Sequence, residues 1–321
     1  MRFNKVLLIC SFFAVLFIIL FSYSAHFGDI SFQLRMARLQ KDVRRIVLEK
    51  NPVEAFASLQ EQIKSNPAIE DECHDIVHEI GHAAYEKYGL KESFKYQNDL
   101  CGSGYIHGVI EKYFEDHKGE AIDATKICNV TDGRCFHGIG HGLMLYHDYD
   151  LLTSVQACMK LAKSFAISNC TDGVFMQYFS TGETKTVNTN AFSICTSFES
   201  FARGSCFFYG PRYHLKYNEL IDKVHAECKK LSGYDRVVCM KGIGSGLTKF
   251  HISDLRIPEN FCFNAEDTDQ ESCVSGMLGY YIVHFNNHAR GKDMCNGFLY
   301  PHKRLCEKAY SEKKTVQERI E

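Results

Sequence analysis

The stretch that decides the fold is residues 217–250, YNELIDKVHAECKKLSGYDRVVCMKGIGSGLTKF, which carries two cysteines, Cys228 and Cys239. The part that ends at Cys228 has helical spacing, residues 232–235 are typical of a turn, and residues 237–250 predict a second helix. A disulfide between the two cysteines would join two antiparallel helix ends across this turn, a distance that a disulfide can span. The stretch therefore predicts a helical hairpin closed by a disulfide.

The same spacing recurs along the chain, at intervals of 33 to 36 residues between the later cysteines of successive pairs. A period of this length is typical of stacked two-helix units. The predicted fold is all-α: an α-solenoid of about seven disulfide-stapled hairpins over residues 69–310, with a period of about 34 residues. The expected disulfides are Cys73–Cys101, Cys128–Cys135, Cys158–Cys170, Cys195–Cys206, Cys228–Cys239, Cys262–Cys273 and Cys295–Cys306.

Period and cysteine placement over residues 70–310 resemble the cysteine-stapled relatives of the Sel1 and tetratricopeptide class of helical-hairpin repeats. The consensus residues of those families are not matched, so the resemblance implies an architecture and nothing more. Second helices of several predicted hairpins also carry glycines four residues apart, such as Gly104 and Gly108. Glycine inside a helix costs about 1 kcal/mol relative to alanine. Because two small residues on one face let a neighbouring helix approach closely, we expect these helices to form a crowded inner layer.

Composition excludes some classes of function. Lys+Arg 37 against Asp+Glu 39 gives a net charge of −2, which lacks the basic excess of a nucleic-acid binder. A hydrophobic fraction of 45% excludes general disorder. The sequence therefore predicts an ordered protein that does not bind nucleic acid.

The amino-terminal segment and the cysteines predict export. After Arg2 and Lys5, residues 6–21 carry no charge, which suits either an uncleaved anchor over residues 1–27 or a signal peptide cleaved after Ser24. Basic residues between positions 35 and 45 favour a cytoplasmic carboxyl side, whereas paired cysteines require an oxidising compartment. We expect a single-pass membrane protein with its amino terminus in the cytoplasm and its bulk in the secretory lumen, at the cell surface or in the periplasm.

The remaining segments have simpler predictions. Residues 28–68 predict an amphipathic helical stalk or cap, with a helix that begins near Pro52. Residues 311–321 are a charged carboxyl-terminal tail. Asn129 and Asn169 each begin a glycosylation triplet, which agrees with export.

Histidines occupy equivalent positions on the first three predicted inner helices, at His82, His107 and His141. His78 and His137 lie one turn earlier, and imidazoles at i and i+4 can reach one ion. Because neighbouring helix axes lie about 8–10 Å apart, two adjacent repeats can share an ion. The candidate ligands are His74, His78, His82, His107, His137, His141 and Glu111. Nitrogen and carboxylate ligands suit zinc first, with iron and copper as alternatives.

Residues 78–82 read HEIGH, which resembles the HExxH motif of the zincin metalloproteases. The resemblance would make His78 and His82 zinc ligands and Glu79 the catalytic base that activates a zinc-bound water. The sister string HGIGH at residues 137–141 has no glutamate, so the histidine pair is the repeated feature.

Three functions follow from these patterns. The first is an exported, membrane-anchored protein that binds a transition metal, either without catalysis or as a metal-dependent hydrolase or oxidoreductase. The second is a non-catalytic scaffold that binds a protein partner on its concave surface. The third is a zinc metalloprotease built on His78, Glu79 and His82.

Overall fold

The computed structural model describes residues 32–128, 132–180, 192–216 and 221–317, and within these ranges it contains helices and no strands. The prediction of an all-α chain is confirmed for these residues. Residues 32–49 form the first described helix. The helices that follow are α2 (Pro52–Ser65), α3 (Cys73–Ser93), α4 (Leu100–Asp116), α5 (Gly133–Tyr146), α6 (Leu151–Met159), α7 (Ser164–Ser180), α8 (Ser200–His214), α9 (Ile221–Lys229), α10 (Gly233–Phe250), α11 (Arg256–Phe263), α12 (Asp267–Phe285), α13 (His288–Gly297) and α14 (His302–Gln317), with short 3₁₀ turns η1 (Pro67–Asp71), η2 (Phe94–Tyr96), η3 (Ala124–Lys126) and η5 (Ser193–Ser197).

Seven disulfides join the cysteines in the pairs that their spacing predicts. From Cys158–Cys170 onward, each ties a short helical element to the longer helix that follows it, as in α9 and α10. The first two differ from the prediction of hairpins. Cys73–Cys101 joins the starts of the long helices α3 and α4, and Cys128 lies in an irregular segment. Between α4 and α5, Gly119 has a φ of +85°, and the described residues form the single 3₁₀ turn η3.

The turn predicted at residues 232–235 is shorter in the structure, because α10 already begins at Gly233. Ser232 is extended, and Asp235 lies in the first turn, where a carboxylate interacts favourably with the helix dipole. The same carboxylate accepts hydrogen bonds from Arg203 of α8. This interhelical pair ties the start of α10 to its neighbour.

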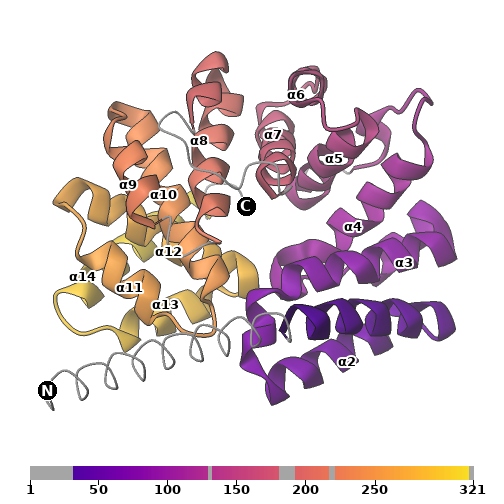
Figure 1. Ribbon diagram of the computed structural model, residues 1–321, viewed down its shortest axis with the longest axis horizontal. Coiled ribbons are helices and arrows are strands. Elements are labelled where there is room, and N and C mark those ends of the chain that lie inside the picture. Colours follow the sequence, from indigo (N-terminus) through magenta and orange to yellow (C-terminus); the bar gives the residue numbers. More distant parts are fainter. Residues whose placement is uncertain (1–31, 129–131, 181–191, 217–220, 318–321) are drawn as a thin grey trace, which may run out of the picture.

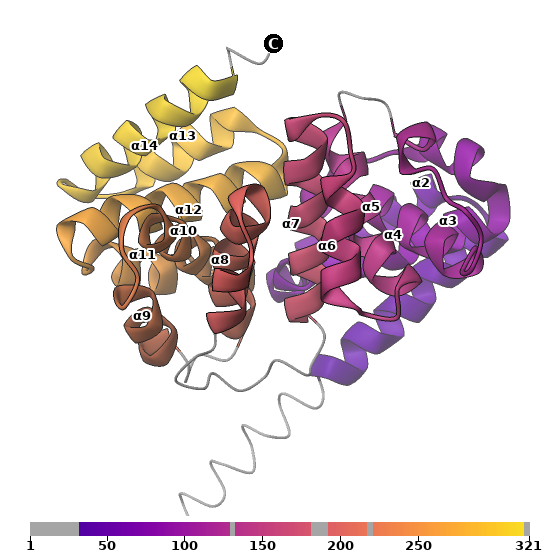
Figure 2. The ribbon, with the colours of Figure 1, turned by 90° about the horizontal axis from the view of Figure 1, so that it is seen from above.

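The inner helices follow one another in the order α3, α4, α5, α7, α8, α10 and α12, each packed against the next (Figure 1). The helices α9, α11 and α14 lie on the left in both views, and α2 to α5 lie on the right (Figures 1 and 2). The last inner helix of this row is not left without a further neighbour, since α12 also packs against α4. The chain therefore brings its carboxyl-terminal half against its first repeats.

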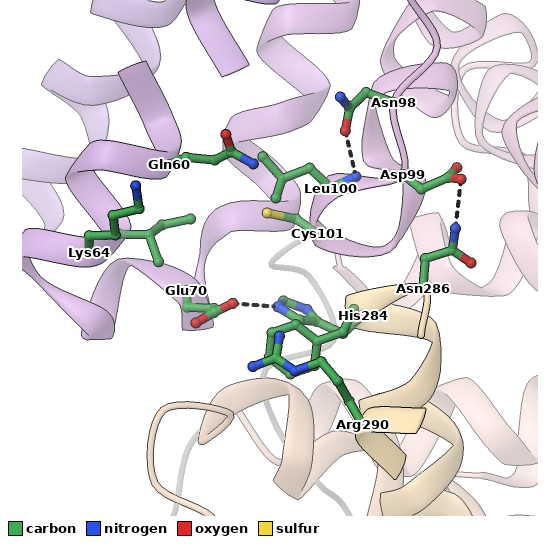
Figure 3. A pocket seen from close by; sticks show the side chains of 12 residues that line it. Gln60, Lys64, Glu70, Asn98, Asp99, Leu100, Cys101, His284, Asn286 and Arg290 are labelled. Atoms are coloured by element: carbon green, nitrogen blue, oxygen red, sulfur yellow. Dashed lines mark hydrogen bonds and ion pairs between the residues drawn. The ribbon is translucent and has the colours of Figure 1, made fainter. Parts of the chain in front are cut away.

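Polar contacts hold the seam where the two halves meet (Figure 3). His284 Nε2 of α12 lies 3.4 Å from Glu70 Oε1, and Asn286 donates a 2.7 Å hydrogen bond to Asp99. A cavity of about 740 Å³ lies at this seam, and none of the predicted metal ligands lines it. The predicted metal ligands thus lie outside this seam cavity, although Asn286 of the seam also lines the cavity beside the histidines.

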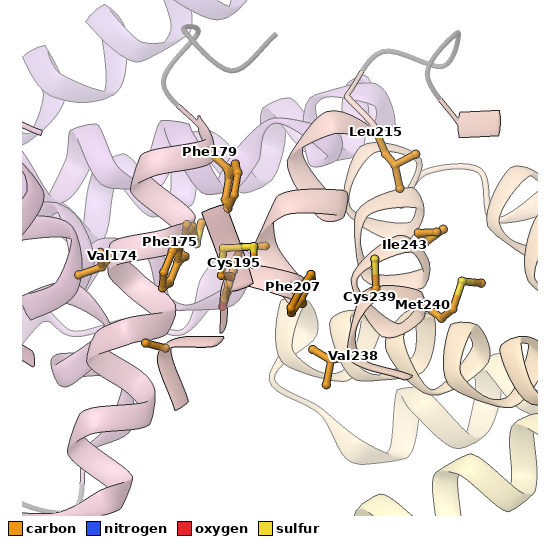
Figure 4. Packing of buried hydrophobic residues seen from close by; sticks show 14 of the residues in the cluster. Val174, Phe175, Phe179, Cys195, Phe207, Leu215, Val238, Cys239, Met240 and Ile243 are labelled. Atoms are coloured by element: carbon orange, nitrogen blue, oxygen red, sulfur yellow. A yellow bond between two sulfur atoms is a disulfide. The ribbon is translucent and has the colours of Figure 1, made fainter. Parts of the chain in front are cut away.

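Apolar side chains fill the space between successive helices. Figure 4 shows Phe175 and Phe179 of α7, Phe207 of α8 and Ile243 of α10 within one continuous hydrophobic cluster. A second cluster joins the helix at residues 32–49 and α2 to α3 and α4. Residues 32–65 therefore pack as a cap on the first inner helices.

Several predicted features lie outside the described residues. These are residues 1–27 with the expected membrane segment, Asn129, and the end of the charged tail at 318–321. Among the described helices, none combines the length and the hydropathy needed to cross a bilayer. The predictions for these segments stay predictions.

Glycines bring α3 and α4 into backbone contact. A Cβ atom on Gly108 would lie 2.1 Å from the carbonyl oxygen of His78, and one on Gly81 would lie 2.3 Å from that of Tyr105. The helices α5 and α7 cross in the same way at Gly140 and Gly173. The recurrent glycines thus have the close-packing role that their spacing predicts, and at Gly108 they set the position of His78.

Replacing Gly108 with alanine is expected to destabilise the fold by about 2 kcal/mol, because the new methyl group must push two backbones apart. Urea unfolding of the oxidised protein measures this loss. Gly297→Ala is the control, since a Cβ atom at that position would meet no heavy atom within 4 Å and its φ is not positive. An equal effect of the two substitutions would contradict the close-packing role.

Candidate metal centre

Helices α3, α4 and α5 bring together the side chains that could hold a metal ion. Two groups of three histidines have ligand nitrogens that all lie within 4.8 Å of one another. We name them the first triad, His74, His78 and His107, and the second triad, His107, His137 and His141. Each triad uses two neighbouring helices, as the spacing of adjacent repeats predicts, and His107 belongs to both.

Hydrogen bonds orient the first triad. His74 Nδ1 donates a 2.7 Å hydrogen bond to the carbonyl oxygen of Cys101, and His78 Nδ1 lies 3.1 Å from Glu111 Oε2. Both partners are acceptors, so the Nδ1 atoms carry the protons. The Nε2 atoms of the two rings face each other and lie only 3.1 Å apart, within hydrogen-bonding distance. Two nitrogens that bind one zinc ion tetrahedrally lie about 3.3 Å apart.

The backbone that presents the Cys101 carbonyl is unusual. Cys101, Gly102 and Ser103 have φ values of 56°, 73° and 64°, all in the left-handed region at the start of α4. Only glycine adopts this region without strain, so Cys101 and Ser103 are held there by their surroundings. The Cys73–Cys101 disulfide and the hydrogen bond from His74 both act on this segment.

The second triad contains two buried nitrogens without hydrogen-bond partners among the described residues, His107 Nδ1 and His141 Nε2. His141 Nδ1 is bonded instead, at 2.8 Å to Gln177 Oε1 and at 3.1 Å to Glu111 Oε1. Unpaired buried polar atoms are rare because each costs free energy. A bound cation would satisfy both nitrogens.

Glu111 connects the two triads. Its carboxylate is 5% exposed and contacts His78, His82 and His141 at 3.1, 2.9 and 3.1 Å. Burial by itself raises the pKa of this carboxyl, but the three histidines outweigh burial and hold the pKa well below its usual range. Glu111 is therefore an anion that orients two ligands through their Nδ1 protons, as carboxylates do behind metal-bound histidines.

His82 has a different position from the one predicted. It belongs to neither triad, and its two nitrogens contact Glu111 and, at 3.5 Å, Glu79. Burial lowers its pKa, but the hydrogen bonds to both carboxylates prevail and raise the pKa to about 9. A protonated imidazole has no lone pair for a metal, so this geometry does not favour the zincin arrangement, in which His78 and His82 share one ion.

Three of the triad histidines are held in the neutral form that binds metal. Burial lowers the pKa of His74, His107 and His137 well below the usual value, and neighbouring histidines lower it further. These rings are neutral at physiological pH, as metal coordination requires.

A cavity of about 430 Å³ opens onto the centre. His74, His107 and His137 line one side, and residues of α7, α8 and α12 line the other. A small molecule could therefore reach the triads. The lining residues outside the first three inner helices include Asn169, Asp172, Met176, Tyr209, Arg212, Tyr280 and His288.

Sequence reasoning missed the far wall of this cavity, although a signal was present. His107 and His141 each follow the later cysteine of their pair by six residues, and the same step from Cys206 leads to Arg212. Extending the alignment to α8 would have placed this arginine toward the histidines.

Asn169, predicted as a glycosylation site, lies in the middle of α7. Its amide donates a hydrogen bond to the carbonyl oxygen of Phe165, and Thr171 of the same triplet is fully buried. Modification at Asn169 stays a prediction.

The chain matches no model of a known protein family, no curated protein and no solved structure. Its function therefore has to follow from the chemistry of the site.

Proposed function

We propose that this chain is a metal-binding protein of an oxidising compartment, with a transition-metal ion held by the first triad, the second triad or both. The observation that carries the proposal is the approach of His74 Nε2 and His78 Nε2 to 3.1 Å. Their Nδ1 atoms contact a carbonyl and a carboxylate, so the Nε2 atoms are the ones turned toward each other. A cation bound by both nitrogens would replace the hydrogen bond that they can share.

The ligand chemistry supports zinc first, with iron and copper as alternatives. All cysteines of the described residues are in disulfides, so the available ligands are imidazoles and carboxylates, which suit all three metals. One observation favours copper at the second triad: the soft Met176 Sδ atom lies 3.2 Å from His137 Nε2. Zinc remains the proposed ion for the first triad, whose neighbours are all nitrogen and oxygen.

We propose further that the ion serves a metal-dependent enzyme, a hydrolase or an oxidoreductase. The cavity beside the triads supports catalysis, because a purely structural site would be closed to small molecules. A scaffold that binds a partner on an open concave surface is less well supported, since α12 packs back against α4.

The remaining parts of the proposal concern architecture and place. We propose that the repeats form an α-solenoid whose last inner helix has closed onto its second. Seven disulfides support an oxidising compartment outside the cytosol. Anchoring through residues 1–27 rests on the uncharged run in the sequence.

Elemental analysis of the purified, oxidised full-length chain tests the metal proposal. We expect one to two equivalents of zinc, iron or copper, or uptake of zinc by the chelator-treated protein. Absence of bound metal, together with no affinity for any of the three ions, would refute the proposal. Glu79→Gln tests the protease alternative separately, since loss of a peptide-hydrolysing activity in this variant would support the HExxH mechanism.

A further inference from the structure

The wall of the cavity that faces the triads carries a buried positive charge. Arg212 of α8 is only 9% exposed, yet its Nε atom has no hydrogen-bond partner among the described residues. Nor does any described carboxylate lie within the 4.0 Å of an ion pair with it. A buried guanidinium whose Nε–H is unpaired is costly, so its presence at a cavity points to a ligand.

Aromatic rings hold the guanidinium in place. Its central carbon lies 5.3, 5.8 and 4.8 Å from the ring centres of Tyr209, Tyr213 and Tyr280. Such contacts stabilise the cation through the faces of the rings. The Nε–H has no hydrogen-bond partner among the described residues. Together with a terminal N–H, it is the group through which arginine binds a planar oxyanion by two parallel hydrogen bonds.

Position relates this arginine to the metal centre. Arg212 stands at the repeat position that His107 and His141 occupy, six residues after the later cysteine. Tyr209 bridges the two groups, because its ring centre lies 6.1 Å from that of His137 and its face contacts Arg212. A molecule held by Arg212 would lie beside the second triad.

The charges of the described residues that line the cavity nearly cancel, so a metal ion would leave it positive. Arg134 is already paired with Asp99 and Asp132. Asp172 is the one carboxylate among the described lining residues, and it makes no ion pair with Arg212 within 4.0 Å. Arg212 therefore balances this carboxylate, and any metal ion in a triad adds positive charge that a ligand would have to offset.

We propose that Arg212 binds the carboxylate or phosphate group of a small molecule whose other end faces the second triad. The placement of that other end rests on the proposed metal centre, whereas the affinity of Arg212 for an oxyanion does not. The substrate class of the site is accordingly a small organic anion.

Isothermal titration of the full-length chain with succinate and, separately, with inorganic phosphate tests this inference in zinc-loaded and chelator-treated protein. We expect at least one of the two anions to bind the wild type, and Arg212→Gln to weaken it about 10- to 100-fold, the range of charge-assisted hydrogen bonds. Arg212→Lys keeps the positive charge but loses the paired N–H groups of the guanidinium, so it should weaken anion binding less. Arg256→Gln, at an exposed arginine of α11, is the control and should bind as the wild type does.

Two results would overturn the inference: neither anion binds the wild type, or a folded Arg212→Gln binds as tightly as the wild type. A measurement on the wild type covers the case in which Arg212→Gln does not fold. The Nε–H resonance of Arg212, assigned by its loss in Arg212→Lys, should shift when the anion is added, and an unchanged resonance would contradict the proposal. Metal uptake without anion binding would refute only this inference, whereas anion binding without metal uptake would refute only the metal centre.

Discussion

Replacing His107 with alanine is expected to weaken metal binding by more than about 100-fold, since even changes behind the ligands cost 10- to 100-fold. The effect should exceed that of any other single histidine, because His107 belongs to both triads. Competition with a chelator of known zinc affinity measures the loss. His74→Ala and His137→Ala then separate the triads, since each of these residues belongs to only one.

The matched control is His117→Ala, at the end of the same helix, where the ring bonds only the carbonyl oxygen of Tyr113. This variant should keep wild-type affinity. Full metal affinity in His107→Ala would show that the triads are not the site. Circular dichroism of each variant confirms that a loss of metal is not a loss of fold.

Replacing Glu111 with glutamine is expected to destabilise the metal-free protein by about 3 kcal/mol, because it removes a buried anion that three histidines contact and leaves His82 with only the longer contact to Glu79. The amide has nearly the same shape, so packing is preserved. Urea unfolding at neutral pH measures the change. Glu115→Gln, on the exposed face of α4, removes only a surface pair with Lys112 and should stay within about 1 kcal/mol of the wild type.

The same substitution has a pH signature at His82. Its pKa of about 9 lies above the value of 6.5 in an unfolded chain, so the folded state binds the proton more tightly. The resulting stability is fully present below pH 6.5 and is lost as the pH rises through 9, a change of about 3 kcal/mol in the metal-free wild type. In Glu111→Gln this slope should shrink, and an NMR titration of His82 should give a lower pKa. An unchanged pKa would show that Glu111 does not hold the proton on His82.

The cysteines made most of the fold predictable. Two covalently joined positions recurring every 33 to 36 residues allow few arrangements, so pairs such as Cys228–Cys239 and the helices beside them follow from spacing. The closure could not be predicted, because the contacts of Glu70 with His284 and of Asp99 with Asn286 join residues far apart in the chain. No periodic pattern marks such pairs.

The sequence predicted which residues lie at the site better than it predicted what each residue does there. Recurrence at one helical position identified His107 and His141, and both belong to the second triad. His82 occupies the equivalent position on α3, but Glu79 and Glu111 lie beside it and keep it protonated. A role of this kind depends on the neighbours that packing supplies, which a motif such as HExxH does not contain.

Because α12 packs back against α4, the histidines can come together during synthesis of the chain before the cavity beside them is complete. All six candidate histidines lie within residues 74–141, so they leave the ribosome and can come together early. Arg212 and Tyr280, which face them across the cavity, are made later, and α12 must dock before that wall is complete. A nascent chain therefore presents its ligand nitrogens to the surrounding solution first. The cavity can restrict which molecules reach these nitrogens only after α12 has docked and completed its wall.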